Sequence, residues 1–234
     1  MKKRKHGTAG FSLVELLVGT ILFTIVTGIA FSLLMSAQLR YQGESTVTEA
    51  FQQANVALDQ IVRDVHSAGY PPMNSLSAAV ANDNAKADKY ALPFAWAPSY
   101  PATPCTVGTG GTCTVPGGYD LIVEADLGNG VQWIRYSLQG TTLMRAMVQK
   151  APFQDPVAST TGLLGPYLEN VMNGSNSLPI FSYGYDAGVT LQQPSNIREV
   201  NISLMVRSLQ PDPQTHQYRT IVVTGQAMRF NPNQ

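Results

Sequence analysis

Residues 1–40, MKKRKHGTAGFSLVELLVGTILFTIVTGIAFSLLMSAQLR, determine how the rest of the chain is organised. The four cations of residues 2–5 precede a long apolar segment, in which the 24 residues 16–39 carry no formal charge. A helix of that length is roughly 36 Å long, which is enough to cross the hydrocarbon core of a membrane. Because positively charged flanks stay in the cytoplasm, the N-terminus should be cytoplasmic and the rest of the chain should lie on the other side of the membrane.

The apolar segment differs from an ordinary secretory signal peptide. It is longer than the usual core of about 7–15 residues, and no small-residue cleavage site follows it. The small residues Ala9 and Gly10 come before it instead, and one acid, Glu15, lies near its start. A charge in a membrane segment is costly, so Glu15 indicates a functional role that involves a partner. The alternative is a plain membrane anchor that tolerates an acid near its end.

The helical pattern continues beyond the apolar segment, now with a single apolar face. Its apolar positions are spaced alternately by four and three residues: Val47, Phe51, Ala54, Leu58, Ile61, Val65 and Ala68. We therefore predict one helix over about residues 11–68, with Gly69 as its C-cap. Residues 11–40 would be the transmembrane or filament-core half. Residues 41–70 would be the amphipathic half, which needs a domain to cover its apolar face because its two clear heptads are too few for a free coiled coil.

Residues 71–234 are predicted to form an extracytoplasmic, β-rich head. Period-two segments predict strands at residues 119–126, 131–138, 141–148, 178–186, 197–209 and 218–230. Asn129-Gly130 is typical of a hairpin turn between the first two of these strands. Residues 149–177 show no clear period, apart from a weak strand or helical turn in GPYLENVM. Successive hairpins form an antiparallel sheet with one buried face, so we predict an α+β fold in which the long helix packs on an antiparallel β-sheet.

Two cysteines, Cys105 and Cys113, lie in a Gly/Thr-rich segment of the head. In an oxidising compartment they are expected to pair and close a short loop. Free thiols or a metal site are the alternatives, although a metal would need further ligands nearby. Phe94, Trp96 and Tyr100 are expected to pack this region against the head.

Composition argues against a nucleic-acid-binding surface and against an enzyme. Lys plus Arg and Asp plus Glu both number 15, so the formal net charge is zero. The three histidines are scattered, and no nucleophile, phosphate-loop or zinc-protease motif is present. Residues 82–88, NDNAKAD, resemble a calcium loop only vaguely and are better explained as a solvated loop. We therefore predict no catalytic residue, no metal and no cofactor.

Seven of the basic residues of the head, those from Arg135 onwards, would decide by their positions in space whether a basic stripe exists. They are dispersed along the sequence: Arg135, Arg145, Lys150, Arg198, Arg207, Arg219 and Arg229.

The segment KHGTAGFSLVELLV resembles the class III signal of type IV prepilins and of type II secretion pseudopilins. The resemblance implies that a membrane peptidase cleaves after Gly10, so that residues 1–10 are a leader, and methylates the new N-terminus at Phe11. It also implies that Glu15 pairs with the Phe11 ammonium of a neighbouring subunit during assembly. Opposite charges attract strongly in a medium of low dielectric, and each is costly there when unpaired.

A second segment, LDQIVRDVHSAGYPP, resembles the end of the long helix in PilW-type minor pilins. Arg63-Asp64 and Ala68-Gly69-Tyr70 match that pattern, whereas His66 stands where an arginine is more usual. The resemblance therefore implies a minor pilin that takes part in initiation, assembly or tip structure of a type IV pilus. A GspJ-type pseudopilin of a type II secretion system is one alternative, and a surface- or DNA-binding pilin-like module is another.

The same resemblance implies the partners and the location of the chain. The partners would be other major and minor pilins, the prepilin peptidase, the inner-membrane assembly platform and the inner membrane itself. The chain would first span the inner membrane once, with its N-terminus in the cytoplasm and its head in the periplasm, and would then enter a pilus at the cell surface. Its role would be structural, as a substrate of the peptidase and not as a catalyst.

Overall fold

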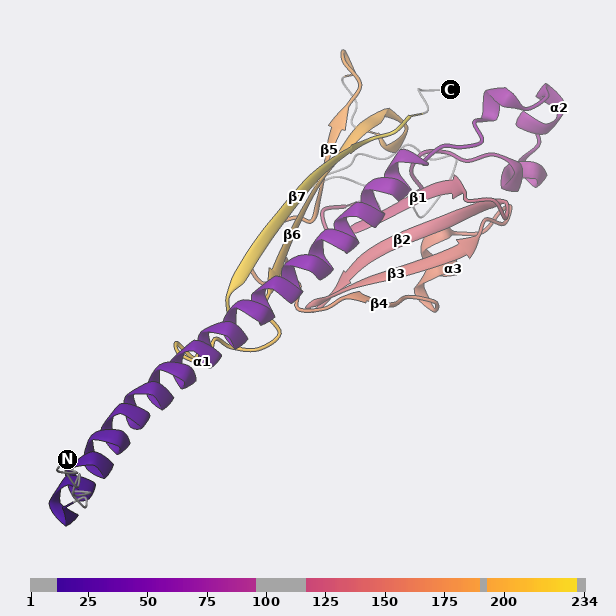
Figure 1. Ribbon diagram of the computed structural model, residues 1–234. Helices are drawn as coiled ribbons and strands as arrows, with labels where there is room; N and C mark the ends of the chain where they lie inside the picture. Colours follow the sequence, from indigo (N-terminus) through magenta and orange to yellow (C-terminus); the bar gives the residue numbers. More distant parts are fainter. Residues whose placement is uncertain (1–11, 96–116, 190–192, 231–234) are drawn as a thin grey trace, which may run out of the picture.

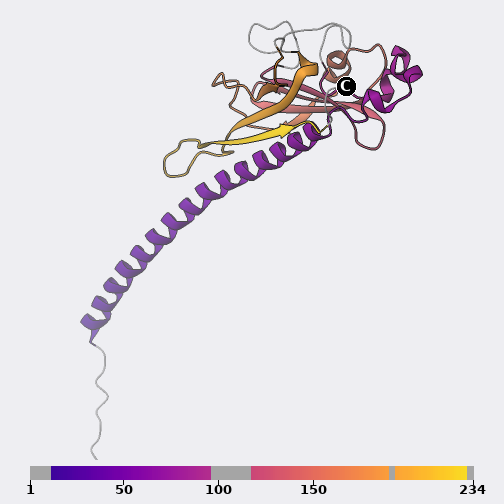
Figure 2. The same cartoon turned by 90° about the horizontal axis from the view of Figure 1, so that it is seen from above.

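The computed structural model describes residues 12–95, 117–189 and 193–230, which form one long helix and a β-rich head (Figure 1). The helix α1 (Leu13–His66) spans 54 residues. Its N-terminal half extends away from the head, and its C-terminal half packs on it (Figure 2). The structure confirms the α+β class and the long N-terminal apolar helix.

The C-terminal end of α1 differs slightly from the prediction. The helix ends at His66 with Ser67 as its C-cap, and not at residue 68 with Gly69 in that role. Gly69 has a positive φ of 78°, and its N–H donates to the carbonyl of Glu124 at 2.8 Å. Gly69 is therefore needed for the turn that brings the end of the helix beside Glu124 of the head.

The first sheet of the head has four antiparallel strands in the order β1-β2-β3-β4. They are β1 (Asp120–Asp126), β2 (Val131–Gln139), β3 (Thr142–Gln149) and β4 (Gly165–Leu168). Gly128 and Gly130 have positive φ angles in the β1–β2 turn, which confirms the hairpin predicted around Asn129-Gly130. Most residues of β1 and β2 are buried on both faces, because residues 93–95 and α3 (Pro156–Thr161) cover the side away from the main core.

The second sheet has three antiparallel strands in the order β5-β6-β7. They are β5 (Phe181–Tyr185), β6 (Ile197–Arg207) and β7 (Thr220–Met228). The prediction of a single sheet was therefore incomplete. The two sheets meet at Val171, whose N–H donates to the carbonyl of Thr141 and which forms an isolated antiparallel bridge with Val206 of β6.

Short helical segments fill the connections between these elements. They are Met73–Ser75, α2 (Ala78–Ala81), Asn84–Lys89, α3 and Pro194–Asn196. Residues 149–177 contain α3, which was not predicted, and β4, which falls in GPYLENVM, where a weak strand or helical turn was expected. Asp155 caps α3 by accepting from the N–H groups of Val157 and Ala158, and Pro156 occupies the first turn. An N-cap acid followed by proline is a recognised helix start, so this signal was present in the sequence and was overlooked.

One apolar core joins α1 to the inner faces of both sheets. Five positions of the predicted stripe are buried in it: Ala54, Leu58, Ile61, Val65 and Ala68. Phe51 was predicted to be buried with them, but its side chain is 49 % exposed. Ala50, Ala57 and Asp64 are buried instead. The buried face is therefore rotated towards small residues, which let the helix approach the sheets closely.

Candidate functional site

The N-terminal half of α1 presents large apolar side chains on every side. Its exposed apolar residues are Leu13, Val14, Leu16, Leu17, Val18, Ile21, Leu22, Phe23, Ile25, Val26, Ile29, Phe31, Leu33, Leu34 and Met35. By length and composition α1 can cross a membrane, and none of its most apolar window is buried inside the molecule. Such a surface is stable only in lipid or against apolar segments of other subunits. The apolar half of α1 with Glu15 is therefore the candidate functional site.

Glu15 lies in the first turn of α1, where it completes a capping box. The backbone N–H of Ser12 donates to Glu15 Oε2 at 3.1 Å, and the N–H of Val14 donates to Ser12 Oγ at 3.4 Å. Both contacts satisfy N–H groups that a helix start leaves without an intrahelical partner. The carboxylate therefore lies at the end of α1 where the helix dipole is positive and where a new N-terminus would be produced.

Several predicted site residues lie outside the described part of the chain. Gly10 and Phe11, expected at the cleavage and methylation site, are among them. So are Cys105 and Cys113, whose disulfide stays a prediction, and Trp96 and Tyr100 of the expected aromatic cluster. Phe94 is described and is buried against β1, where it bridges Val123.

The head first touches α1 just beyond the apolar half. A Cβ atom on Gly43 would lie 3.4 Å from Asp212 Oδ2 and 3.5 Å from the ring of Pro213, so a glycine permits this close approach. Arg219 donates to Glu44 Oε1 at 3.0 Å and to Asp212 Oδ2 at 2.6 Å. The loop between β6 and β7 is thus fixed to the helix about 6 Å beyond the end of the uncharged run, at 1.5 Å per residue.

A second polar contact fixes the other end of α1 to the first sheet. Asp64, almost fully buried, accepts from the Tyr136 hydroxyl at 2.5 Å and from Arg145 at 3.0 Å. Arg145 Nε also donates to the Tyr136 oxygen at 3.0 Å. Burial raises the pKa of Tyr136, and the negative charge of Asp64 raises it further. Asp64, in the segment that resembles PilW-type pilins, thus has a structural role that sequence reasoning did not identify.

A buried ion pair holds the segment after α1 against the first sheet. Lys150 Nζ donates to Glu124 Oε2 at 2.7 Å and to the carbonyl of Tyr90 at 2.9 Å. The same carboxylate accepts from the Trp133 indole N–H at 2.8 Å and from the backbone N–H of Leu92 at 2.8 Å. Because both charges are almost fully buried, each depends on this network for its stability.

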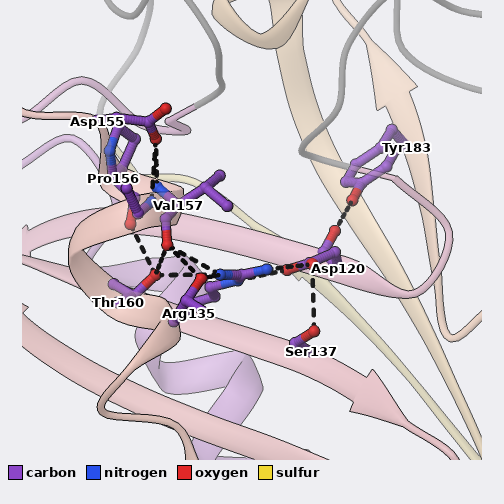
Figure 3. Close-up of polar contacts among 10 residues, drawn as sticks. Asp120, Arg135, Ser137, Asp155, Pro156, Val157, Thr160 and Tyr183 are labelled. Carbon is purple, nitrogen blue, oxygen red and sulfur yellow. Dashed lines mark hydrogen bonds and ion pairs between the residues drawn. The ribbon is translucent and has the colours of Figure 1, made fainter.

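A third polar network joins the first sheet to α3 and to the second sheet (Figure 3). Arg135 forms two hydrogen bonds to Asp120, with Nε 3.0 Å from Oδ1 and Nη2 2.8 Å from Oδ2. Its Nη1 donates to the Val157 carbonyl at 3.1 Å and to Thr160 Oγ1 at 3.3 Å. The Tyr183 hydroxyl of β5 reaches the Asp120 carbonyl at 3.3 Å. The Arg135 guanidinium therefore donates its hydrogen bonds to groups within the head.

These networks decide how many of the seven basic residues from Arg135 onwards are open to an anionic ligand. Five of them form ion pairs with carboxylates: Arg135, Arg145, Lys150, Arg219 and Arg229. The guanidinium of Arg207 lies 4.3 Å from the centre of the Tyr218 ring. Arg198 is exposed, but a single exposed arginine does not make a stripe for phosphates.

The segment that vaguely resembled a calcium loop is largely helical. Asp83 caps the helical turn Asn84–Lys89 by accepting from the Ala85 N–H at 3.0 Å, and it pairs with Lys86 at 3.5 Å. Asp88 pairs with Lys89 at 2.9 Å. Across residues 12–95, 117–189 and 193–230 no group of His, Cys, Asp and Glu side chains is arranged to hold a metal ion.

Comparison with known families places one motif on the chain. The family model for the prokaryotic N-terminal methylation motif matches residues 5–31, which include Gly10, Phe11 and Glu15. This motif indicates a type IV pilin-like or pseudopilin protein and thereby suggests a structural subunit and a substrate of the prepilin peptidase. The motif and the apolar helix fit a membrane-anchored pilin. Comparisons with curated proteins and with solved structures found no match.

Proposed function

We propose that the chain is a minor pilin that takes part in the initiation, assembly or tip structure of a type IV pilus. The observation that carries the proposal is the methylation motif at the start of a helix whose apolar half is exposed on all sides. Such a half-helix needs either lipid or a bundle of similar helices around it. A subunit that moves from one to the other keeps its apolar surface away from water throughout.

The segment that resembles PilW-type minor pilins supports the choice of a minor pilin. Ala68 is buried, Gly69 makes the turn out of α1, and the carbonyl of Tyr70 accepts from the N–H of Asp126 at 2.8 Å. These residues join the helix to the edge of β1. The ion pairs within the head leave few free cations, which favours an assembly role over binding of DNA.

The proposed assembly step depends on charges at the N-terminus. Removal of residues 1–10 would release the amine of Phe11 at the start of α1. Glu15 lies four residues after Phe11 in the sequence, so its carboxylate would meet such an amine on a neighbouring subunit that is displaced along the helix axis. Two opposite charges in an apolar bundle stabilise each other and disfavour registers in which either is left alone.

The decisive experiment separates the charge of Glu15 from its capping role. Glu15→Gln removes the charge but keeps a side chain that can complete a capping box. We expect this variant to be processed and to have a folded head, yet to be lost from sheared filaments. Ser12→Ala is the matched control, because it weakens the cap and leaves the carboxylate in place. Normal incorporation of the Glu15→Gln variant would contradict the proposal.

A separate experiment tests the cleavage after Gly10 and the methylation of Phe11. Mass spectrometry of the mature protein should find an N-terminal, methylated Phe11, and Gly10→Ala should slow the shift in gel mobility that accompanies cleavage. A mature N-terminus at any other residue would refute the assignment of the cleavage site.

The methylation motif also occurs in pseudopilins, so a GspJ-type pseudopilin of a type II secretion system is the second candidate. Deletion of the gene distinguishes the two functions. Loss of pili with normal secretion supports the minor pilin, whereas loss of secreted enzymes with normal pili supports the pseudopilin.

A further inference from the structure

One edge of β7 is free of hydrogen bonds within the described chain. Ser208 N–H donates to the Arg219 carbonyl, and Arg229 N–H donates to the Arg198 carbonyl. Since partners alternate along an antiparallel pair, the odd-numbered residues of β7 direct their N–H and C=O groups to β6. The even-numbered residues direct theirs to the open edge: Thr220, Val222, Thr224, Gln226 and Met228. Because β7 ends the strand order of its sheet, these groups have no strand beside them in the described ranges.

The β7 edge lacks the features that usually protect such an edge from other chains. Natural edge strands carry charges, prolines or bulges, or they are very short. The sequence of β7, TIVVTGQAM, contains no charge and no proline, and its register with β6 is unbroken. Val222 is 51 % exposed and Met228 is 43 % exposed, so apolar side chains accompany the free backbone groups.

An exposed aromatic residue, Phe51, lies on the face of α1 that contacts β7. Leu58 contacts Gly225 of β7 so closely that a Cβ atom there would lie 2.9 Å from Leu58 Cδ1. Phe51 precedes Leu58 by two helical turns and therefore shares its face of α1. Its side chain is half exposed, although a sequence of this pattern predicts that it is buried. The face of α1 that packs on β7 therefore continues into an exposed aromatic side chain.

The directions of α1 and β7 decide which kind of chain can occupy the edge. Three contacts follow one another in the same order along both elements. Glu44 meets Arg219 at 3.0 Å, Leu58 meets Gly225, and the rings of His66 and Phe230 are 4.6 Å apart. The helix and the strand therefore run the same way, side by side (Figure 1).

This direction excludes a symmetric pair of copies. Antiparallel pairing of β7 with β7 of a second copy would turn the two α1 helices in opposite directions. Two helices that cross one membrane with both N-termini in the cytoplasm cannot be arranged in that way. With a symmetric pair excluded, we take the occupant to be a segment of another subunit in the same assembly.

We propose that the free edge of β7 binds an extended, largely uncharged segment of a different pilin-like subunit, which adds to the sheet as an extra strand. The backbone of the segment pairs with the even-numbered residues of β7, and its apolar side chains cover Phe51 and Val222. The choice of a pilin-like partner rests on the proposed function, whereas the strand acceptor itself rests on the geometry of β7.

A proline tests the edge without breaking the sheet. Thr224→Pro removes an N–H that points to the open edge and leaves the bonds between β6 and β7 in place, and proline is tolerated on edge strands for this reason. Thr224→Val is the matched control, because it keeps the N–H and the strand propensity. Equal thermal unfolding of the two full-length variants in detergent would establish that both heads are folded.

Binding is measured in cells by photo-crosslinking of the full-length protein. A photo-reactive phenylalanine derivative replaces Gln226 on β7, and the same group at Met147, exposed on β3, is the control position. We expect Gln226 to give a cross-link to a polypeptide that itself carries a methylation motif. Thr224→Pro should lower its yield about tenfold, because it removes one backbone hydrogen bond and blocks close approach, whereas Thr224→Val should not.

Each other outcome overturns the proposal. A product with the mass of two copies of this chain would show a second copy at the edge, and a product within one chain would show that the chain covers its own edge. Absence of a product, or equal yields from the Pro and Val variants, would show that the β7 edge does not accept a strand. A partner without a methylation motif would refute the choice of partner. Failure of the proposed function would be recognised separately from failure of the strand acceptor, because the unsubstituted protein would then be absent from filaments.

Discussion

Replacement of Asp64 by asparagine should destabilise the head strongly, because Asp64 links α1 to two polar groups of the first sheet. Asp64 is 1 % exposed, and its carboxylate accepts from Tyr136 and from Arg145. Asp64→Asn keeps the shape but removes the charge that compensates Arg145. Breaking a buried pair typically costs 3–5 kcal/mol, and since the Arg145 side chain is 22 % exposed we expect about 3 kcal/mol.

Thermal unfolding of the full-length protein in detergent, followed by near-ultraviolet circular dichroism, measures this loss. For a domain of this size about 3 kcal/mol corresponds to a decrease in Tm of about 6–12 °C. Asp59→Asn is the matched control, since Asp59 is an exposed acid on the same helix and should change the free energy of unfolding by less than about 0.5 kcal/mol.

A double-mutant cycle measures how strongly Asp64 and Arg145 stabilise each other. If Asp64 and Arg145 stabilise each other, Arg145→Met should remove most of the additional cost of Asp64→Asn, with a coupling of about 1–3 kcal/mol. Additive effects of the two substitutions, or a loss below about 1 kcal/mol for Asp64→Asn alone, would show that the pair does not fix α1 to the head.

Three further predictions concern other contacts. Glu124→Gln should lower the free energy of unfolding by about 3 kcal/mol in urea titrations, because it leaves the buried Lys150 without that carboxylate. Gly43→Leu should weaken the contact between α1 and the β6–β7 loop, seen as faster hydrogen exchange in residues 208–219, whereas Gly19→Leu should not affect the head. The N–H groups of Gln214 and Thr215, and then Arg219, hold the pKa of Asp212 below its usual 3.8. The stability this gives the loop is present above pH 3.8 and is lost as the pH falls through the lower folded value, so amide exchange in the loop should accelerate only in that acidic range.

The features that could be predicted from sequence are those with a local signal. The uncharged run of residues 16–39 and the absence of proline predict α1, and Asn129-Gly130 predicts the first hairpin. The motif around Glu15 could be identified because its residue types and spacing are particular. The Asp155-Pro156 start of α3 was also a local signal, but it was not recognised.

The features that could not be predicted depend on contacts between distant parts of the chain. The junction between the two sheets rests on Val171, which meets Thr141 and Val206 and lies in a segment for which only a weak strand or helical turn was predicted. The burial of Asp64 depends on Tyr136, a residue 72 positions away, and Phe51 is exposed although Leu58 and Val65 on the same face of α1 are buried. Apolar spacing alone predicts neither feature, and Asp64 looks like a solvated acid until its partners are known.

The parallel course of α1 and β7 has a mechanical consequence. Tension applied to the apolar end of the helix, while the head is held by its neighbours, loads the contacts from Glu44 to His66 in shear. Contacts in shear share the load and fail together, whereas contacts that peel fail one after another. Single-molecule pulling along the axis of α1 should therefore need a larger rupture force than pulling perpendicular to it, and equal forces would mean that the helix detaches contact by contact.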